Sequence, residues 1–297
     1  MLLRVRRKQK KERVLCRLPL IEFADFSFKY LGAETLALRR ISLKVESGEY
    51  LVLTGPSGCG KTTLCRAING LVPQFHRGYI AGNVYVDGKD TRDYSVAQLA
   101  PIAGLVFQEP ENQLVTLNVE REIAFGPENL GVDPNEVRRR VEDLIEMLDL
   151  EHLRDKHPHE MSGGEQQRVA IAATLALKPK ILVADEPTSN LDPRSAETIL
   201  ELISDLNRND LTVVLVEHRL DLVSKDASRV ILMDKGSIVA DGEPREVLTM
   251  DLCQEIGVGI PKATHLYKRL KGRGLNLNSV PLTGAELAAL VQEVKQN

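Results

Sequence analysis

The chain has 297 residues, of which 43% are hydrophobic and 27% charged, and a formal net charge of −3. This length allows one large or two modest domains with a substantial core. The composition is that of an ordinary globular protein, and the near-neutral charge gives no general basis for nucleic-acid binding, so we expect no nucleic-acid partner. The four cysteines form no C-x-x-C pair or disulfide framework, which predicts a reducing compartment.

The first residues, MLLRVRRKQKKERVLCRL, are basic and lack the apolar centre of a signal peptide. We expect residues 1–20 to form a solvated basic tail, with attraction to anionic lipid headgroups as the alternative. No run of 18 or more apolar residues occurs in the sequence. A role in transport would therefore require a membrane partner.

Alternating apolar and polar residues predict an antiparallel layer in the next part of the chain. The pattern occurs in IEFADFSFKY (residues 21–30) and again in LRRISLKV (residues 38–45), and NVYVDGKD (residues 83–90) is a further strand that enters an Asp-Gly turn. Tyr30, at the end of the first strand, is either an edge-strand core residue or a platform on which a nucleotide base stacks. The sequence leaves both interpretations open.

A phosphate-binding loop is predicted within residues 50–71, YLVLTGPSGCGKTTLCRAINGL, between an apolar strand and a helix on which Leu64, Ile68 and Leu71 share a face. Its G-x-x-x-x-G-K-[ST] pattern lets backbone N–H groups surround phosphates at a helix N-terminus. Lys61 would contact the β and γ phosphates, and the Thr62 hydroxyl would ligate Mg²⁺. The predicted nucleotide contacts here are Gly55, Pro56, Ser57, Gly58, Cys59, Gly60, Lys61, Thr62 and Thr63. Cys59 is either a variable loop position or a redox-reactive thiol.

A short apolar run ends at Gln108, shortly before Pro110. A glutamine at a strand end is able to ligate a metal or position a water, whereas a loop glutamine is usually solvated. Residues 117–160 then change to a helical pattern, with a predicted capping box of Asp133 and Glu136.

A second helix start follows at Ser162-Gly163-Gly164, where Ser162 and Glu165 have the spacing of a capping box. This segment is either an ordinary capped helix start with permissive glycines or a second site at which backbone N–H groups bind a phosphate.

Two buried strands end in side chains suited to phosphate chemistry. The first, ILVAD (residues 181–185), is apolar on both faces and so belongs in the middle of a parallel sheet. At its carboxyl end lie two carboxylates, Asp185 and Glu186, and this position favours the interpretation that they serve as a Mg²⁺ ligand and a general base. The second, LTVVLVE (residues 211–217), delivers His218, which either caps the next helix or contacts a γ phosphate; we favour the latter.

The remaining pattern is a helix that begins at Asp192-Pro193, a hairpin over residues 229–242, and a looser composition from residue 246 onward. The last helix is capped by Thr283 and Glu286. Its apolar stripe would cover either the domain or a partner copy.

In their order, these motifs make residues 21–245 resemble the ATP-binding cassette (ABC) family of ATPases. The matching features are an aromatic residue at Tyr30, the Walker A loop GPSGCGKTT, Gln108 of the Q-loop, the signature MSGGEQQR, the Walker B strand ILVADE, the D-loop SNLD and the switch histidine His218. The signature departs from LSGGQ at Met161 and Glu165. The resemblance implies an α/β P-loop NTPase fold, with a RecA-like, mostly parallel sheet, an N-terminal antiparallel layer and a helical subdomain at about residues 110–165. The cassette would span residues 21–245, and residues 246–297 would form a C-terminal extension.

The family resemblance also implies how ATP is bound and hydrolysed. Two cassettes pair head to tail, so Ser162, Gly163 and Gly164 would contact the nucleotide held by the partner. Mg²⁺ would be held by Thr62, Gln108 and Asp185, Glu186 would polarise the attacking water, and His218 and Lys61 would stabilise the γ phosphate.

Within the family, EPENQ after Gln108, VEHRLD around His218, and the tail segments GIPKATHLYKRL and LTGAEL are similar to the ATPase component of energy-coupling-factor (ECF) importers. This resemblance implies import of a vitamin or transition-metal ion at the cytoplasmic face of the membrane. The implied partners are a second ABC ATPase subunit, identical or different, a transmembrane coupling subunit that docks after Gln108, and a substrate-binding membrane subunit. The alternative is an ABC ATPase that acts on ribosomes or DNA. That class is expected to carry paired cassettes or a long coiled-coil insertion, and neither is visible here.

Overall fold

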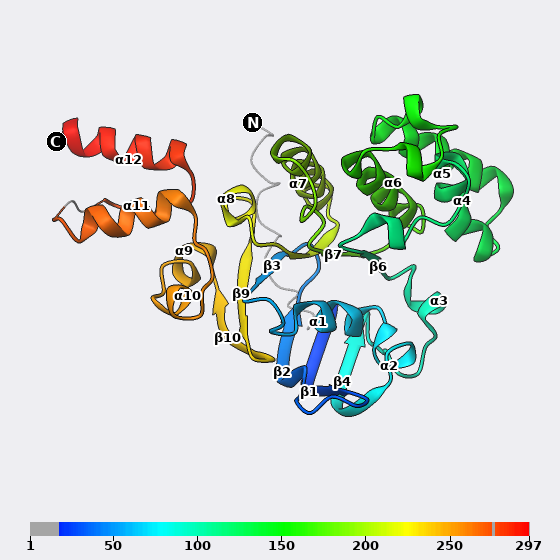
Figure 1. Cartoon of the computed structure of the whole chain (residues 1–297), viewed down its shortest axis with the longest axis horizontal. Coiled ribbons are helices and arrows are strands. Elements are labelled where there is room, and N and C mark those ends of the chain that lie inside the picture. The colour runs from blue at the N-terminus through cyan, green and yellow to red at the C-terminus, as the bar shows by residue number, and fades with distance from the viewer. Residues whose placement is uncertain (1–17, 275–276, 297) are drawn as a thin grey trace, which may run out of the picture.

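The computed structural model describes residues 18–274 and 277–296, so most of the predicted basic tail lies outside the described residues. The described strands form two sheets (Figure 1). One is a four-stranded sheet of order β2-β1-β4-β5, made of β1 (Ile21–Tyr30), β2 (Leu38–Val45), β4 (Gly78–Val86) and β5 (Lys89–Asp90). The other is a six-stranded sheet of order β10-β9-β3-β8-β7-β6, made of β3 (Tyr50–Thr54), β6 (Ala103–Val106), β7 (Ile181–Asp185), β8 (Thr212–Val216), β9 (Arg229–Asp234) and β10 (Ser237–Gly242).

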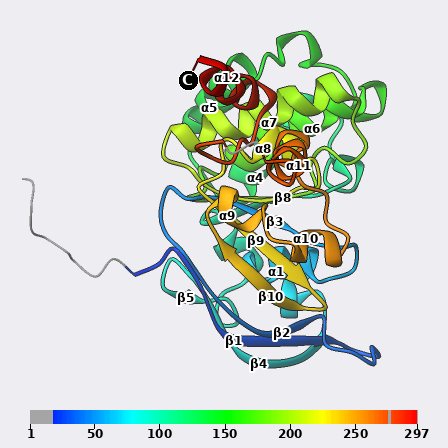
Figure 2. The same cartoon turned by 90° about the vertical axis from the view of Figure 1, so that its left-hand side faces the viewer.

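The four-stranded sheet is antiparallel throughout, with β1 paired to β2 on one side and β4 on the other. Its strands alternate buried and exposed residues because one face packs on the core while the other meets solvent. Figure 2 shows this sheet as the lowest layer of the molecule. The predicted antiparallel layer is confirmed.

The six-stranded sheet is parallel from β9 to β6, and only β10 runs antiparallel at its edge. All residues of β3, β7 and β8 are buried, because helices or the other sheet cover both faces. Parallel pairing brings the carboxyl ends of β3, β8 and β7 to the same edge. The predicted mostly parallel core is therefore confirmed.

Helix α1 (Lys61–Ile68) lies between the two sheets. Its buried side chains, among them Leu64 and Ile68, share one hydrophobic core with residues of both sheets. The prediction that this helix continues to Leu71 is wrong. The helix stops at Ile68, Gly70 has a φ of 80°, and Leu71 begins the short α2 (Leu71–Gln74).

A separate helical region follows β6 and has its own core. It lies at one end of the molecule (Figure 1) and contains α4 (Val119–Asn129), α5 (Pro134–Met147), α6 (Gly163–Leu175) and the short 3-10 turns η1 (Pro110–Asn112), η2 (Glu151–Leu153) and η3 (Pro158–Glu160), while α3 (Val96–Leu99) precedes β6. Asp133 caps α5 by accepting from the N–H groups of Asn135 and Glu136, as predicted. The reciprocal half of that capping box is wrong, because the Glu136 carboxylate pairs with Arg139, Arg140 and Lys178 instead.

The second face of the parallel sheet is covered by α7 (Pro193–Arg208) and α8 (Leu220–Val223) together with α9 (Pro244–Val247) and α10 (Leu252–Glu255). Asp192 caps α7, as expected. The chain then forms α11 (Lys262–Lys271) and α12 (Gly284–Gln296), which lie side by side at the opposite end from the helical region (Figure 1). The Thr283 hydroxyl accepts from the Glu286 N–H, which confirms the Thr283 half of the predicted cap. The Glu286 carboxylate accepts instead from the Leu282 N–H and from Arg245.

Substituting Leu53→Ala should reveal how strongly the phosphate loop depends on the core beneath it. Leu53 is 0% exposed in the strand before the loop, so its loss should lower the free energy of unfolding by about 2–5 kcal/mol. Urea denaturation of the purified chain measures this change. Leu31→Ala, at a side chain that is 67% exposed, is the control and should shift stability by less than about 0.5 kcal/mol. Equal losses for the two variants would contradict this placement of the core.

Candidate functional site

The predicted phosphate loop joins the carboxyl end of β3 to the start of α1. Two of its glycines are required by the space around them. A Cβ on Gly55 would lie 2.3 Å from the Met233 carbonyl oxygen, and one on Gly60 would lie 2.5 Å from that of Ala37. Gly60 also has a φ of 109°, a conformation that L side chains rarely adopt. The loop therefore exposes backbone rather than side chains at a helix N-terminus.

Lys61 is 4% exposed, and its ammonium group lies within the loop. Its Nζ donates to the carbonyl oxygens of Gly55 at 3.0 Å and Pro56 at 3.2 Å. The same Nζ is 3.9 Å from the Glu186 carboxylate. One cation thus links the phosphate loop to the end of β7.

Asp185 ends β7 and is 5% exposed. Burial raises the pKa of its carboxyl group, while a hydrogen bond with Thr62 acts in the opposite direction. Among the described residues, Asp185 Oδ1 has no hydrogen-bond partner although it is buried. A buried carboxylate oxygen left unpaired beside a threonine hydroxyl fits a hard cation such as Mg²⁺, which prefers oxygen ligands.

Glu186 and His218 form a contact pair between the ends of β7 and β8. His218 Nε2 lies 3.0 Å from Glu186 Oε1. His218 lowers the pKa of the Glu186 carboxyl group, burial opposes this, and Lys61 adds to the lowering. Glu186 has a φ of 50°, and its N–H donates to the Val216 carbonyl at 3.1 Å. The structure therefore brings together Lys61, Glu186 and His218 as the sequence predicted, and Thr62 with Asp185.

Tyr30 both packs against the core and reaches the phosphate helix. Its ring makes edge contacts with Phe28 at 4.8 Å and His76 at 6.1 Å between centroids. Its hydroxyl lies 3.1 Å from the Thr63 hydroxyl. Tyr30 therefore packs as a core residue, which is one of its two interpretations. Its hydroxyl also contacts α1, the helix that follows the phosphate loop.

Gln108 lies two residues beyond the end of β6, with an exposed side chain. The backbone N–H and the backbone carbonyl of its neighbour Phe107 are both hydrogen-bonded to glutamine side chains. The Phe107 N–H donates to Gln113 Oε1 at 3.1 Å, and its carbonyl accepts from Gln167 Nε2 at 3.5 Å. Since Gln167 belongs to α6, the loop of Gln108 is attached to the helix that Ser162 caps.

The capping box at the start of α6 is present as predicted. Glu165 Oε2 accepts from the Ser162 N–H at 2.7 Å and from its hydroxyl at 2.8 Å. Ser162 and Gly164 border a cavity of about 270 Å³, lined also by Asp149, His152, Glu165, Arg168 and Ser195. None of these residues comes from the phosphate loop, so the two predicted phosphate sites of one chain are separate.

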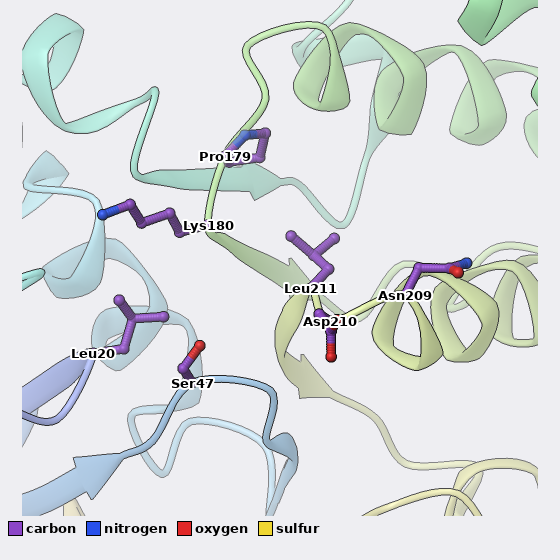
Figure 3. Close-up of a pocket in the computed structure, with 7 residues that line it drawn as sticks. All are labelled: Leu20, Ser47, Pro179, Lys180, Asn209, Asp210 and Leu211. Atoms are coloured by element: carbon purple, nitrogen blue, oxygen red, sulfur yellow. The ribbon is translucent and has the colours of Figure 1, made fainter. Parts of the chain in front are cut away.

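A second cavity, of about 260 Å³, lies near residues that precede strands: Ser47 before β3, Lys180 before β7 and Leu211 before β8 (Figure 3). The phosphate loop follows the carboxyl end of β3. The cavity in Figure 3 therefore lies at the amino ends of these strands, away from the side chains that converge at their carboxyl ends.

Glu217 is a site-adjacent residue that the sequence analysis did not single out. It is 3% exposed, and its carboxyl group accepts from the backbone N–H groups of His218 and Arg219 and from the Thr188 hydroxyl. The available signal was a charged residue at the end of an otherwise apolar strand.

In the described part of the chain, no three or more His, Cys, Asp or Glu side chains gather as a metal site. No helix among the described residues is long and apolar enough to cross a membrane.

Comparison with known proteins identifies the family. Residues 38–189 match the family model described as ABC transporter. A protein of Pyrococcus abyssi named as an ABC transporter ATP-binding protein is 43% identical over 263 residues, which cover 88% of this chain and 94% of that protein. The energy-coupling factor transporter ATP-binding protein EcfA1 of Clostridium perfringens is 38% identical over 283 residues, which cover 93% and 99%.

Solved structures agree. The structure of cbiO1 from Clostridium perfringens, described as part of the ABC transporter complex cbiONQ, has a TM-score of 0.70 at 30% identity and covers 84% of this chain and 99% of its own. The dimeric ATP-binding cassette MJ0796, in a post-hydrolysis state bound to ADP and Pi, has a TM-score of 0.66 at 30% identity and covers 76% and 99%. The chain therefore belongs to the ABC transporter family, as an ATP-binding subunit that hydrolyses ATP.

Proposed function

We propose that this chain is the ATPase subunit of an ECF-type importer, attached to the cytoplasmic face of a membrane and coupled to uptake of a vitamin or transition-metal ion. The observation that carries the catalytic part is that Lys61 and His218, from two other segments, both contact Glu186, at 3.9 Å and 3.0 Å. The similarity to EcfA1 of Clostridium perfringens and to cbiO1 supports the ECF assignment.

In the proposed mechanism, the phosphate loop holds the phosphates of ATP and Lys61 neutralises charge on the γ phosphate. Glu186 accepts a proton from the attacking water; the lowered pKa of its carboxyl group keeps it ionised for this role near neutral pH. His218, in contact with Glu186, stabilises the transferring phosphoryl group.

The residues that would hold Mg²⁺ are Thr62, Asp185 and Gln108. When bound, the ion supplies charge neutralisation for the phosphate oxygens. The unpaired, buried Oδ1 of Asp185 supports its part in this set. Exposed Gln108 would reach the site by movement of its loop.

A second ABC ATPase subunit, identical or different, is the proposed partner at the nucleotide. The cavity beside Ser162 and Gly164 lies apart from the phosphate loop of the same chain, so these residues and Gly163 would complete the partner's site. The dimeric state of MJ0796 supports this arrangement.

The proposed docking surface for the transmembrane coupling subunit follows Gln108. It would draw on four large apolar side chains within residues 115–130 that are 41% to 67% exposed: Val115, Leu117, Phe125 and Leu130. Exposed apolar side chains that gather in one region are typical of interaction surfaces. The substrate-binding membrane subunit would join through this coupling subunit.

The substitution Glu186→Gln tests the catalytic assignment. It removes the proton acceptor but preserves shape, so ATP hydrolysis should fall by about 10² to 10⁴ while ATP still binds. Steady-state turnover and calorimetric ATP binding of the purified chain measure the two effects. Glu146→Gln, at an exposed position on α5, is the control. Unchanged turnover in the Glu186 variant would rule out its role as general base.

The substitution Asp185→Asn tests the metal assignment. Loss of the charged ligand should raise the Mg²⁺ concentration that half-saturates nucleotide binding by about tenfold or more. A Mg²⁺ titration followed by a fluorescent ATP analogue reports this directly. The exposed Asp205→Asn variant should titrate like the unsubstituted chain. An unaltered titration of Asp185→Asn would remove this residue from the ligand set.

The double substitution Val115→Glu and Leu117→Glu tests the docking surface. Both side chains are at least 65% exposed, so turnover of the isolated chain should persist, while co-purification of integral membrane proteins in mild detergent should be lost because charge replaces the apolar contact. Leu31→Glu, equally exposed in the turn after β1, is the matched control. Recovery of ribosomal or DNA-bound partners alone would instead favour the non-transport ABC ATPase.

A further inference from the structure

We propose that Glu217 is a positioning residue that fixes His218 against Glu186 through a hydrogen-bonded clamp to residues 188–191. The clamp is defined by two contacts, Glu217 with Thr188 and Arg219 with the Leu191 carbonyl. This inference rests on the proposed role of His218 at the γ phosphate.

The backbone around His218 must be held in place, because packing of the exposed imidazole alone does not fix its position. The imidazole is 43% exposed and stands on the short segment between β8 and α8. An exposed side chain on a loop has few packing contacts of its own, so the range of positions it reaches depends on how firmly its backbone is held. Its 3.0 Å contact with Glu186 therefore depends on the backbone of residues 217–219.

The Glu217 carboxyl group fixes that backbone. Its Oε1 accepts from the His218 N–H at 2.8 Å and the Arg219 N–H at 2.9 Å. Its own N–H donates to the Leu53 carbonyl at 3.3 Å, in the strand that leads into the phosphate loop. The backbone of Glu217 thus binds β3, and its side chain binds the backbone of the next two residues.

The other oxygen of Glu217 attaches this segment to the chain beyond Glu186. Thr188, which is 0% exposed, donates its hydroxyl to Oε2 at 2.6 Å. On the far side of His218, Arg219 Nη2 donates to the Leu191 carbonyl at 3.0 Å. Two bonds that flank the histidine therefore hold it against the segment that carries its partner, Glu186.

This clamp predicts that Glu217 acts on turnover only through His218. Glu217→Ala should lower kcat by about 10- to 100-fold, as expected for a displaced catalytic group, and leave the Kd for ATP nearly unchanged. In a chain that already carries His218→Ala, the same substitution should lower kcat by less than about twofold, because no imidazole remains to be positioned.

The conservative variant separates positioning from bulk stability. In Glu217→Gln, the amide oxygen still accepts from both N–H groups and the amide nitrogen is able to donate to Thr188, so kcat should return to within about threefold of the unsubstituted chain. If Glu217→Ala does not fold, Thr188→Val breaks the clamp from the other side and should show a smaller loss with the same dependence on His218.

Glu122→Ala is the matched structural control. Glu122 is also a buried glutamate, 4% exposed, and its carboxyl group accepts from the N–H groups of Val115 and Thr116. Its removal should lower the melting temperature of the chain, but any change in kcat should be the same factor with and without His218.

The four chains of the Glu217 and His218 cycle are compared by steady-state ATPase assays at several protein concentrations, with ATP binding measured in parallel. Equal losses from Glu217→Ala in both backgrounds, or failure of Glu217→Gln to restore turnover, would overturn the clamp while leaving the proposed function standing. Full turnover in His218→Ala alone would instead overturn the proposed role of His218, and the clamp with it.

Discussion

The parallel pairing of β3 with β8 and of β8 with β7 is the constraint on which the site depends. Parallel strands must end at the same edge, so the phosphate loop, His218 and the Asp185-Glu186 pair become neighbours although up to 163 residues separate them in the sequence. Complete burial of the three strands makes a slip in register costly, because any shift would expose apolar side chains and unpair backbone groups. Catalytic geometry is thus set by hydrophobic packing.

Charge is then distributed unevenly along that edge. Asp185 is held in a buried position that raises the pKa of its carboxyl group, whereas the neighbouring Glu186 has its pKa lowered by His218 and Lys61. Adjacent carboxyl groups in different surroundings are suited to different tasks. In the proposed function, Asp185 meets a cation and Glu186 meets a water molecule. The backbone of Glu186 has a φ of 50°, an uncommon conformation of the kind that clusters at functional sites.

Much of this architecture could be predicted from sequence because it is local. Apolar strands, the glycine-rich loop and the Ser162 cap each follow from a few adjacent residues. One failure was local, because α1 stops at Ile68 and Gly70 has a φ of 80°. The others arose where further side chains intervened. Glu136 has the spacing to cap α5, but Lys178, which is 42 residues away, and two arginines bind its carboxylate instead. Glu217 was missed because its burial depends on Thr188, whose position only the folded sheet defines. The domain boundaries and individual site roles remain predictions.

The position of α1 between the two sheets has a further thermodynamic consequence. Its side chains join the antiparallel layer and the parallel sheet in one core, and its N-terminus is the phosphate loop. A ligand that binds only the folded loop stabilises every element that must be folded for the loop to exist. Nucleotide binding would therefore stabilise both layers. Amide hydrogen exchange would slow well beyond the loop, in strands that never touch the ligand.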